Sequence, residues 1–274
     1  MTKRAAALFL AALLGSCSGP DPRVLRVCAD PNNPPFSNRS GQGFENRVAE
    51  LVAAELGARI DYTWWAQRRG NVRETLNAGL CDLIPGVAAG LEMLATTRPY
   101  YHSTYVAVSR ADRGLAIASF DDPRLRDLRI GVQMVGDDFS NTPPAHALAR
   151  RGVVANVRGY MVYGDYGRPA PQSEIVSAVA RGEIDVAFVW GPVAGYFASR
   201  QPVRLELVPV PPEDRMTELP MAFGVAMGLR RGDAELKEDV ERALDRRGGD
   251  VQRILAGYGI PTVASSPAPV EDDD

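Results

Sequence analysis

The sequence predicts an α/β protein made of two similar lobes, with the chain crossing twice between them at a hinge. Strand-like and helix-like segments alternate after Val24, which is typical of a parallel sheet covered by helices on both faces. Short segments of the first half also recur in the second half at one fixed spacing. Together these two observations favour a pair of lobes of like construction.

The first half predicts three strands joined by two helices. Apolar Val48, Leu51, Val52 and Leu56 recur at helical spacing, and Gly57 ends that helix. Alternating or continuously apolar segments on either side are typical of strands. The expected order is strand 24–28, helix 45–56, strand 59–65, helix 72–78 and strand 82–87.

The second half repeats this plan. Leu25-Arg26-Val27 recurs as Leu128-Arg129-Ile130, 103 residues later. At the same spacing Gly79 corresponds to Gly182 and Asp82 to Asp185, so that a Gly-x-x-Asp segment opens an apolar strand in each half. Ordinary helix-to-strand turns produce one such coincidence, whereas three at a single spacing favour two related lobes.

Two strands are predicted to carry the chain between the lobes. Residues 105–108 lead out of the first lobe, and 222–227 lead back before a helix that starts within 231–236 and a last helix ending near Tyr258. The predicted lobes are therefore 24–106 plus 222–263, and 107–221. Ligands of open α/β sheets gather beyond the carboxyl ends of the strands, so the cleft between the lobes is the expected site.

The two ends of the chain predict export and a disordered tail. Residues 1–17 combine a positive start, a short apolar run and small residues, as in a secretory signal, and the run is too short for a permanent membrane span. Leu14-Gly15-Ser16-Cys17 resembles a bacterial lipobox, so Cys17 is a candidate for lipidation, with cleavage into a soluble protein as the alternative. Residues 264–274 form an acidic tail with too little apolar surface to pack. We expect a periplasmic protein, soluble or lipid-anchored.

Composition and motifs argue against an enzyme, a metalloprotein or a nucleic-acid binder. The 274 residues are 45% hydrophobic and 24% charged with a net charge of −3, which excludes wholesale disorder and offers no basic surface to nucleic acid. His102 and His146 are the only histidines and lack zinc spacing, and no nucleophile or phosphate-loop motif occurs. We expect no catalytic residue, metal or cofactor. A paired-carboxylate site is the minor alternative, formed by Asp30, Glu45, Asp137 and Asp138.

Whether Cys28 and Cys81 form a disulfide is left open by the sequence. An oxidising compartment favours the bond. Cys28 lies late in its predicted strand and Cys81 before the next, and parallel pairing would put them at opposite ends of the sheet, beyond bridging distance.

Several motifs spread along the chain resemble one family. The repeated Gly-x-x-Asp, Arg98-Pro-Tyr-Tyr101 and Arg231-Gly-Asp-Ala-Glu-Leu236 look like the family 3 periplasmic solute-binding proteins, which have the type II periplasmic-binding-protein fold. Finer motifs are similar to the MxaJ/XoxJ group, which is associated with PQQ-dependent methanol dehydrogenases. They are Arg26–Asn33 with Pro35–Asn38, Gly43–Asn46, Tyr62–Trp65 with Gln67–Gly70, Asn141–His146, Val162–Tyr166 and Val189–Pro192.

The resemblance implies that a free amino acid is not the ligand. Amino-acid receptors of the family hold the ligand carboxylate with an arginine in the loop after the first Gly-x-x-Asp strand, and its ammonium with an aspartate after the second. Here the first loop, Val87–Leu91, contains no arginine, and Trp190 stands at the second place.

Aromatic and amide side chains near strand ends are predicted to form a ligand or partner cleft, because their faces can stack on a planar group. Core packing is the alternative for the tryptophans, and one of the adjacent Trp64 and Trp65 should face outward. Arg69 either binds a carboxylate-rich cofactor or an acidic partner, or is solvated. Asn141 or Thr142 is expected to cap a helix. The predicted set is Asn32, Phe36, Trp65, Arg69, Asp138, Asn141, Tyr163 and Trp190.

Two functions from different classes follow. The resemblance implies a non-catalytic accessory protein for a PQQ-dependent methanol dehydrogenase, which it would meet by transient docking. The alternative is an ABC-importer receptor for a small solute other than an amino acid.

Overall fold

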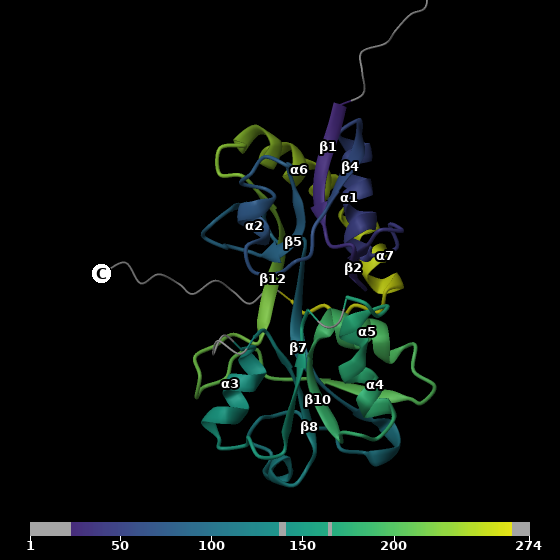
Figure 1. The fold of residues 1–274 in the computed structure, drawn as a ribbon, viewed down its shortest axis with the longest axis vertical. Helices are drawn as coiled ribbons and strands as arrows, with labels where there is room; N and C mark the ends of the chain where they lie inside the picture. Colours follow the sequence, from purple (N-terminus) through teal and green to yellow (C-terminus); the bar gives the residue numbers. More distant parts are fainter. Residues whose placement is uncertain (1–22, 137–140, 164–165, 265–274) are drawn as a thin grey trace, which may run out of the picture.

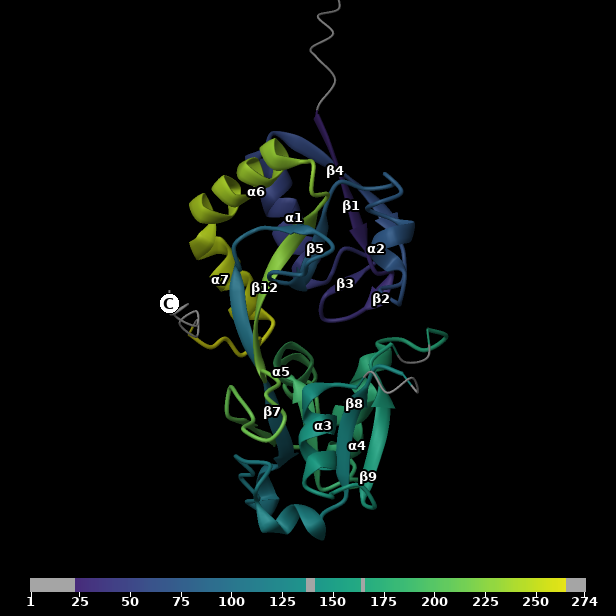
Figure 2. The same cartoon turned by 90° about the vertical axis from the view of Figure 1, so that its left-hand side faces the viewer.

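The chain folds into two stacked α/β lobes connected by two long strands (Figures 1 and 2). The computed structural model describes residues 23–136, 141–163 and 166–264. The predicted signal segment with Cys17 lies outside these residues, as do Asp137, Asp138 and the tail beyond Ala264. Within the described ranges, none of the helices has both the length and the apolar character needed to cross a membrane.

The upper lobe in Figure 1 is formed by the two ends of the described chain. Its strands and helices are β1 (Arg23–Ala29), β2 (Asn32–Asn33), β3 (Ser37–Asn38), α1 (Phe44–Glu55), β4 (Ala58–Trp64), α2 (Asn71–Glu74), β5 (Ile84–Ala88), β6 (Ala95–Thr96), α6 (Ala234–Arg246) and α7 (Gly248–Gly257). The lobe is joined to the other by β7 (Tyr101–Arg110) and β12 (Ala222–Leu229).

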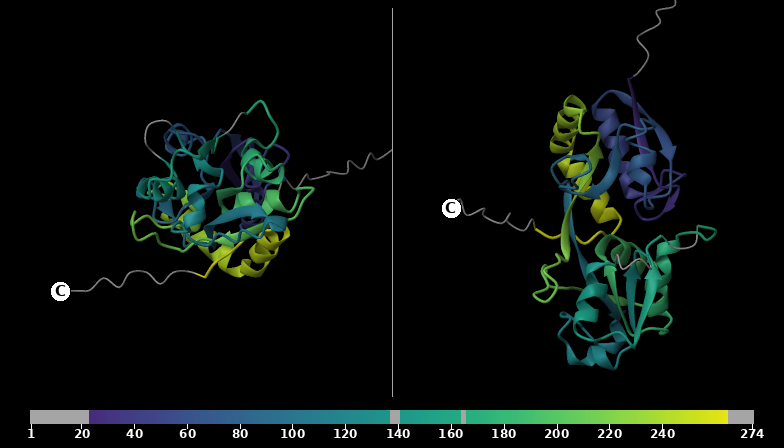
Figure 3. Two further views of the ribbon diagram at one scale, coloured as in Figure 1. Left: turned by 90° about the horizontal axis from the view of Figure 1, so that it is seen from below. Right: turned by 60° about the vertical axis from the view of Figure 1, so that its left-hand side comes forward.

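The lower lobe is formed by the middle of the chain. It contains the 3-10 helices η1 (Ala111–Arg113), η2 (Pro123–Arg126) and η3 (Pro171–Ser173), the strands β8 (Ile130–Met134), β9 (Val157–Met161), β10 (Val186–Trp190) and β11 (Leu205–Pro209), and the helices α3 (Pro143–Arg150), α4 (Glu174–Ala180) and α5 (Gly191–Ala198). The right-hand view of Figure 3 shows β7, β12 and the chain after α7 beside the junction of the lobes.

The strand pairing is mixed rather than all parallel, which corrects one expectation. β1 pairs with β4 in parallel, and β8 pairs in parallel with both β9 and β10. β12, however, is antiparallel to β5 and β7, and β7 is antiparallel to β10 and β11. The reason is that β7 serves both lobes: Tyr101–Thr104 pair with β12, and Tyr105–Arg110 pair with β10 and β11.

The predicted repeat marks the same ion pair in each lobe. Asp82 accepts hydrogen bonds from the backbone N–H and the guanidinium of Arg26, and Asp185 accepts the same bonds from Arg129. Gly79 and Gly182 precede these aspartates with left-handed φ values of 75° and 72°, which glycine adopts without strain. The recurring residues therefore fix how each helix returns to its sheet.

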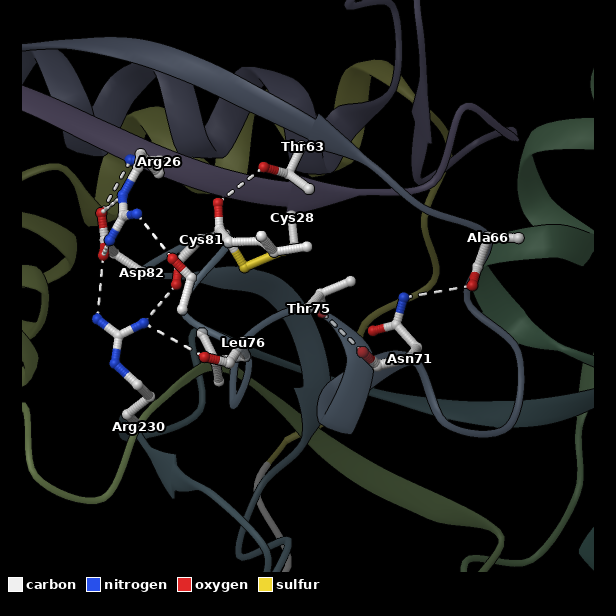
Figure 4. Close-up of a disulfide and its surroundings, with 12 residues drawn as sticks. Arg26, Cys28, Thr63, Ala66, Asn71, Thr75, Leu76, Cys81, Asp82 and Arg230 are labelled. Carbon is white, nitrogen blue, oxygen red and sulfur yellow. Dashed lines mark hydrogen bonds and ion pairs between the residues drawn. A yellow bond between two sulfur atoms is a disulfide. The ribbon is translucent and has the colours of Figure 1, made fainter.

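Cys28 and Cys81 form a disulfide, with their Cα atoms 5.5 Å apart (Figure 4). The expectation that they lie at opposite strand ends is wrong, because the segment before β5 runs beside β1 in parallel, with Leu83 bridged to Val27, and this register brings Cys81 next to Cys28. The backbone N–H groups of Asp82 and Leu83 both donate to Arg26 O, at 2.8 and 3.2 Å. At the corresponding positions of the other lobe stand Gly131 and Ile184, where a β-carbon on Gly131 would lie 2.6 Å from Ile184 Cδ1.

Two elements are shorter than predicted. The helix expected over 72–78 ends at Glu74. There the hydroxyl of Thr75 donates to Asn71 O, and the next backbone bond, from Asn77 N to Val72 O, spans five residues instead of the four of an α-helix. The strand expected from Asp82 begins at Ile84, since Asp82 is held by Arg26.

Each lobe has its own apolar core. In the lower lobe Val186 and Phe188 face the α3 side of the sheet, while Ala187 and Val189 pack against the α4 and α5 side. This alternation accounts for the continuously apolar sequence of β10, which is buried on both faces. The boundaries 24–106 plus 222–263 and 107–221 stay a prediction.

Candidate functional site

A cavity of about 380 Å³ lies between the lobes, at the carboxyl ends of their parallel strands. β5 and the segment after β1 border it from the upper lobe, and β8, β10 and the start of α3 from the lower lobe. Its side chains are mostly aromatic or amide-bearing. The lining consists of Asn33, Phe36, Glu45, Gln67, Gly86, Val87, Ala88, Tyr101, Tyr105, Gln133, Val135, Thr142, Val162, Gln172, Trp190, Phe223 and Val225.

Trp190 lies at the centre of this junction. It is the last residue of β10, and its backbone N–H donates to Gln133 Oε1 at 2.8 Å. Its ring meets Tyr105 and Phe223 edge-on, with centroids 5.3 and 5.8 Å away. Because Trp190 contacts the cores of both lobes while lining the cavity, it serves packing and the candidate site together.

Phe36 lines the cavity from the opposite lobe. It follows the turn after β2, where its N–H donates to Asn33 O at 2.9 Å, and its ring packs against Phe44. Phe36 also contacts the lower-lobe core that includes α4 and α5. At Phe36 and Trp190 the two lobes therefore meet through aromatic rings.

A chain of amide groups crosses the cavity. Gln133 Nε2 donates to Gln172 Oε1 at 3.3 Å, and Gln172 in turn donates to Asn33 Oδ1 in the other lobe. Thr142, at the start of α3, donates its hydroxyl to Gln133 O at 2.6 Å and so ties the helix to β8. These bonds hold neutral polar groups at fixed positions along an otherwise apolar wall.

The rim of the cavity is closed by bonds between the lobes. Asn32 Nδ2 donates to Arg168 O at 2.9 Å, and the Tyr166 hydroxyl donates to the buried carboxylate of Asp30. Burial and this bond raise the pKa of Tyr166. Arg68 lies over the Tyr166 ring at 4.5 Å, so a strip of the lower lobe is fastened against the loops after β1 and β4.

Glu45 is an ionisable group inside the cavity. It lies in the first turn of α1 with only 4% of its surface exposed. Burial, together with the negative charge of Asp30, raises its pKa to about 8. A β-carbon on Gly86 would lie 1.9 Å from Glu45 Oε1, so the glycine of β5 makes the space that the carboxyl group occupies.

The structure places two of the predicted cleft residues, Phe36 and Trp190, in the cavity lining. Asn32 bonds across the lobes at the rim instead. Trp65 is 42% exposed and lies outside the lining, because β4 ends at Trp64 and the chain turns outward there. Arg69, Tyr163 and Asn141 also lie outside the lining, although their neighbours Val162 and Thr142 belong to it. Asp138 falls outside the described residues.

Several lining residues were missed by the reasoning from sequence. Gln133 lies near the carboxyl end of β8, where the rule that selected Trp190 applies. Phe223 lies near the start of β12, where that rule does not apply. Tyr105 was read only as part of a crossing strand. Asp30 and Glu45, named for a paired-carboxylate site, do come together, because the end of β1 and the start of α1 are adjacent. In the described part of the chain, no group of three or more metal-ligating side chains is found.

Comparison with known proteins identifies the family. Residues 25–259 match the bacterial extracellular solute-binding proteins, family 3. The chain belongs to this family. Protein MoxJ of Methylorubrum extorquens AM1 is 32% identical over 259 residues, covering 90% of this chain and 84% of MoxJ.

Solved structures agree with this family membership and with the predicted resemblance to the MxaJ/XoxJ group. Periplasmic binding protein XoxJ from Methylobacterium extorquens AM1 is 36% identical, covers 88% of this chain and all of XoxJ, and has a TM-score of 0.72. MxaJ from Methlophaga aminisulfidivorans MPT is 25% identical, covers 87% of this chain and all of MxaJ, and has a TM-score of 0.74. The predicted type II periplasmic-binding-protein fold is thereby confirmed.

The described lining of the cleft contains neither of the two charges that the resemblance assigns to amino-acid receptors. Val87, Ala88 and Trp190 line the cavity at the places where the resemblance leads us to expect the arginine and the aspartate of an amino-acid receptor. Neither arginine nor lysine occurs among the described lining residues. A carboxylate entering the cavity would therefore meet rings, amides and Glu45 instead of a cation.

Proposed function

We propose that this protein is a non-catalytic periplasmic accessory protein that assists the maturation or activation of a PQQ-dependent methanol dehydrogenase. Its likeness to MoxJ and XoxJ over nearly the whole described chain carries this proposal. The missing charge clamp of the amino-acid receptors is consistent with it. The protein would act by docking transiently on the dehydrogenase.

The composition of the cavity favours docking on a protein segment over holding the cofactor. A carboxylate-rich quinone needs cations to neutralise it. The described lining offers none and presents Glu45 instead. Rings such as Trp190 and Phe36 suit apolar or aromatic side chains of a partner.

Co-purification from the native host tests this proposal and locates the contact. A tagged wild-type protein should retain the dehydrogenase large subunit. Loss of the subunit with Trp190→Ala, and also with the gentler Trp190→Phe, indicates docking in the cleft. Loss with Trp65→Ala alone indicates docking on the exposed surface of the upper lobe, where Trp65 is 42% exposed.

The matched control is Val154→Ala. Val154 is 60% exposed in the loop before β9, at the end of the lower sheet that faces away from the cavity. This variant should retain the subunit. Absence of the dehydrogenase from the wild-type purification, under conditions that preserve weak complexes, contradicts the proposal.

The cavity itself favours a second candidate, a receptor for a small solute of an ABC importer. Here a solute would bind between the lobes and stabilise their closed arrangement. Trp190 fluorescence should then change on addition of the solute, and the bonds from Asn32 and Tyr166 across the rim should persist only when it is bound. A protein purified from its host without any bound small molecule argues for the accessory function instead.

A further inference from the structure

The cavity contains a buried carboxyl group, that of Glu45, for which the described residues supply no partner. Glu45 lines the cavity with 4% of its surface exposed. Among the described residues no hydrogen-bond donor or cation contacts its carboxyl oxygens, although its own backbone N–H is bonded to Phe36 O at 3.0 Å. A buried ionisable group without a partner is costly, so its presence in the cavity points to a ligand that supplies one.

The described groups that surround the Glu45 carboxyl group are negative or neutral. Asp30, at the end of β1, adds a second negative charge, and its carboxylate is occupied by bonds from Asn32 N, Gln67 N and the Tyr166 hydroxyl. Tyr100 and Tyr101 lie near Glu45 at the start of β7. Burial is the main cause of their raised pKa values, and the negative charge of Glu45 raises them further. β5 presents only the uncharged Gly86.

Aromatic rings line the space in front of the carboxyl group. The faces of aromatic rings carry partial negative charge and attract cations in desolvated sites. A cavity of about 380 Å³ leaves room for an apolar body as well as a charged end. The rings in question belong to Phe36, Tyr101, Tyr105, Trp190 and Phe223.

We propose that the cavity selects a monocationic organic amine, whose ammonium group pairs with Glu45 while its apolar body lies against the aromatic rings. On binding, Glu45 loses its proton to solvent, and the carboxylate so formed accepts hydrogen bonds from the ammonium group. Before the amine binds, Glu45 is largely protonated at neutral pH, since burial raises its pKa to about 8. This inference does not rest on the dehydrogenase partner proposed above.

The test compares three probes that share one body and differ in charge: 2-phenylethylamine, 2-phenylethanol and 3-phenylpropanoate. Calorimetric titration of the purified mature protein at pH 7 should show the amine binding at least about tenfold more tightly than the alcohol, with the carboxylate weakest. Between about pH 6 and 8 the affinity for the amine should rise by up to about tenfold per pH unit, because binding releases the proton of Glu45.

Substitution of Glu45 tests whether its carboxyl group causes the preference for the amine. Glu45→Gln keeps the shape of the side chain and should remove the preference for the amine, together with its pH dependence. Glu50→Gln, on the exposed face of the same helix and paired with Arg47, is the matched control and should keep both. Titration of the wild type in two buffers of different ionisation enthalpy measures the released proton without any variant.

Three results would overturn the inference. They are equal binding of amine and alcohol, failure of the amine to bind at all, and an unchanged preference for the amine in Glu45→Gln. Because the titrations contain no dehydrogenase, none of these results tests the accessory function. In turn, failure of the dehydrogenase to co-purify would not test the binding of an amine.

Discussion

At the scale of single residues, the neutral carboxyl group of Glu45 is the clearest departure from ordinary behaviour. Its pKa of about 8 arises from burial first and from the charge of Asp30 second. In the unfolded chain the same group titrates near 4.5. Over the interval between these values the folded protein holds a proton that the unfolded chain has released.

This difference predicts that Glu45 destabilises the protein as the pH rises. The folded state binds the extra proton between about pH 4.5 and 8, so the free energy of unfolding falls across this range. Glu45→Gln removes the titrating group, and its stability relative to wild type should increase from pH 5 to pH 8 by an amount on the order of 3–5 kcal/mol. Urea unfolding at several pH values measures this, with Glu50→Gln as control. A difference that is independent of pH contradicts the account.

Gly86 is the second residue whose role follows from local geometry. A β-carbon there would lie 1.9 Å from Glu45 Oε1 and 2.6 Å from its Cδ. Gly86→Ala should therefore destabilise the protein by roughly 1–3 kcal/mol through overpacking. Adding Glu45→Ala should recover most of that loss, whereas adding Glu50→Ala should recover none. Purely additive effects of Gly86→Ala and Glu45→Ala would show that the two positions do not meet.

The sequence predicted some of the cavity-lining residues and missed others, for physical reasons. Trp190 and Phe36 are large aromatic residues at the end of a strand and in the turn after one, positions that a sequence pattern can suggest. Trp65 occupies a similar position, but its orientation depends on the turn after β4, which no pattern in the sequence encodes. Glu45 reads as an ordinary acidic residue in the first turn of a helix, and only burial against β5 makes it unusual.

At the scale of elements, the Arg–Asp pair is repeated in both lobes, whereas the disulfide between Cys28 and Cys81 belongs to the upper lobe alone. Arg26 binds Asp82 in the same way as Arg129 binds Asp185. Burial alone would raise the pKa of Asp82, but the hydrogen bonds from Arg26 and Arg230 hold this pKa below its usual range. The spacing of 103 residues predicted this equivalence. It did not predict the disulfide, because the disulfide depends on the register in which the segment before β5 pairs with β1, and backbone bonds between Arg26, Cys28 and Leu83 set that register.

The disulfide should contribute substantially to stability. Its two cysteines are separated by 53 residues, and closing a loop of that length stabilises the folded state by about 4 kcal/mol through loss of entropy in the unfolded chain. Cys28→Ala combined with Cys81→Ala should lower the urea midpoint accordingly, and a reducing agent should shift the wild type in the same direction but leave the double variant unchanged. A wild type that is insensitive to reduction, although its thiols are shown to be free, would contradict this.

At the scale of the whole molecule, the two lobes share strands rather than a flexible linker. β7 contributes its first residues to one sheet and its last residues to the other, and β12 returns beside it. Motion of the lobes must therefore bend these strands near Thr104 and Tyr105, while the bonds of Asn32 and Asp30 to the lower lobe hold the rim closed. The aromatic junction at Trp190 lies between the shared strands and the rim bonds. We therefore expect that binding of a partner or ligand at Trp190 changes how tightly the two lobes close.

The sequence predicted the two-lobed α/β plan because helix periodicity, turn glycines and the repeated Arg and Asp are local signals. The antiparallel placement of β7 and β12 was missed because it depends on which lobe each half of a strand joins. The amide chain of Gln133, Gln172 and Asn33 was missed for a related reason, since its members are brought together only by closure of the lobes.

The central claim, that this protein supports a PQQ-dependent methanol dehydrogenase, is tested most directly by the enzyme itself. The measurement is methanol-dependent dye reduction by periplasmic extracts of the host, with and without the gene, at matched amounts of dehydrogenase large subunit. The account predicts that activity per subunit falls several-fold in the deletion strain and returns when the wild-type gene is restored. Equal activity per subunit in the two strains would contradict it.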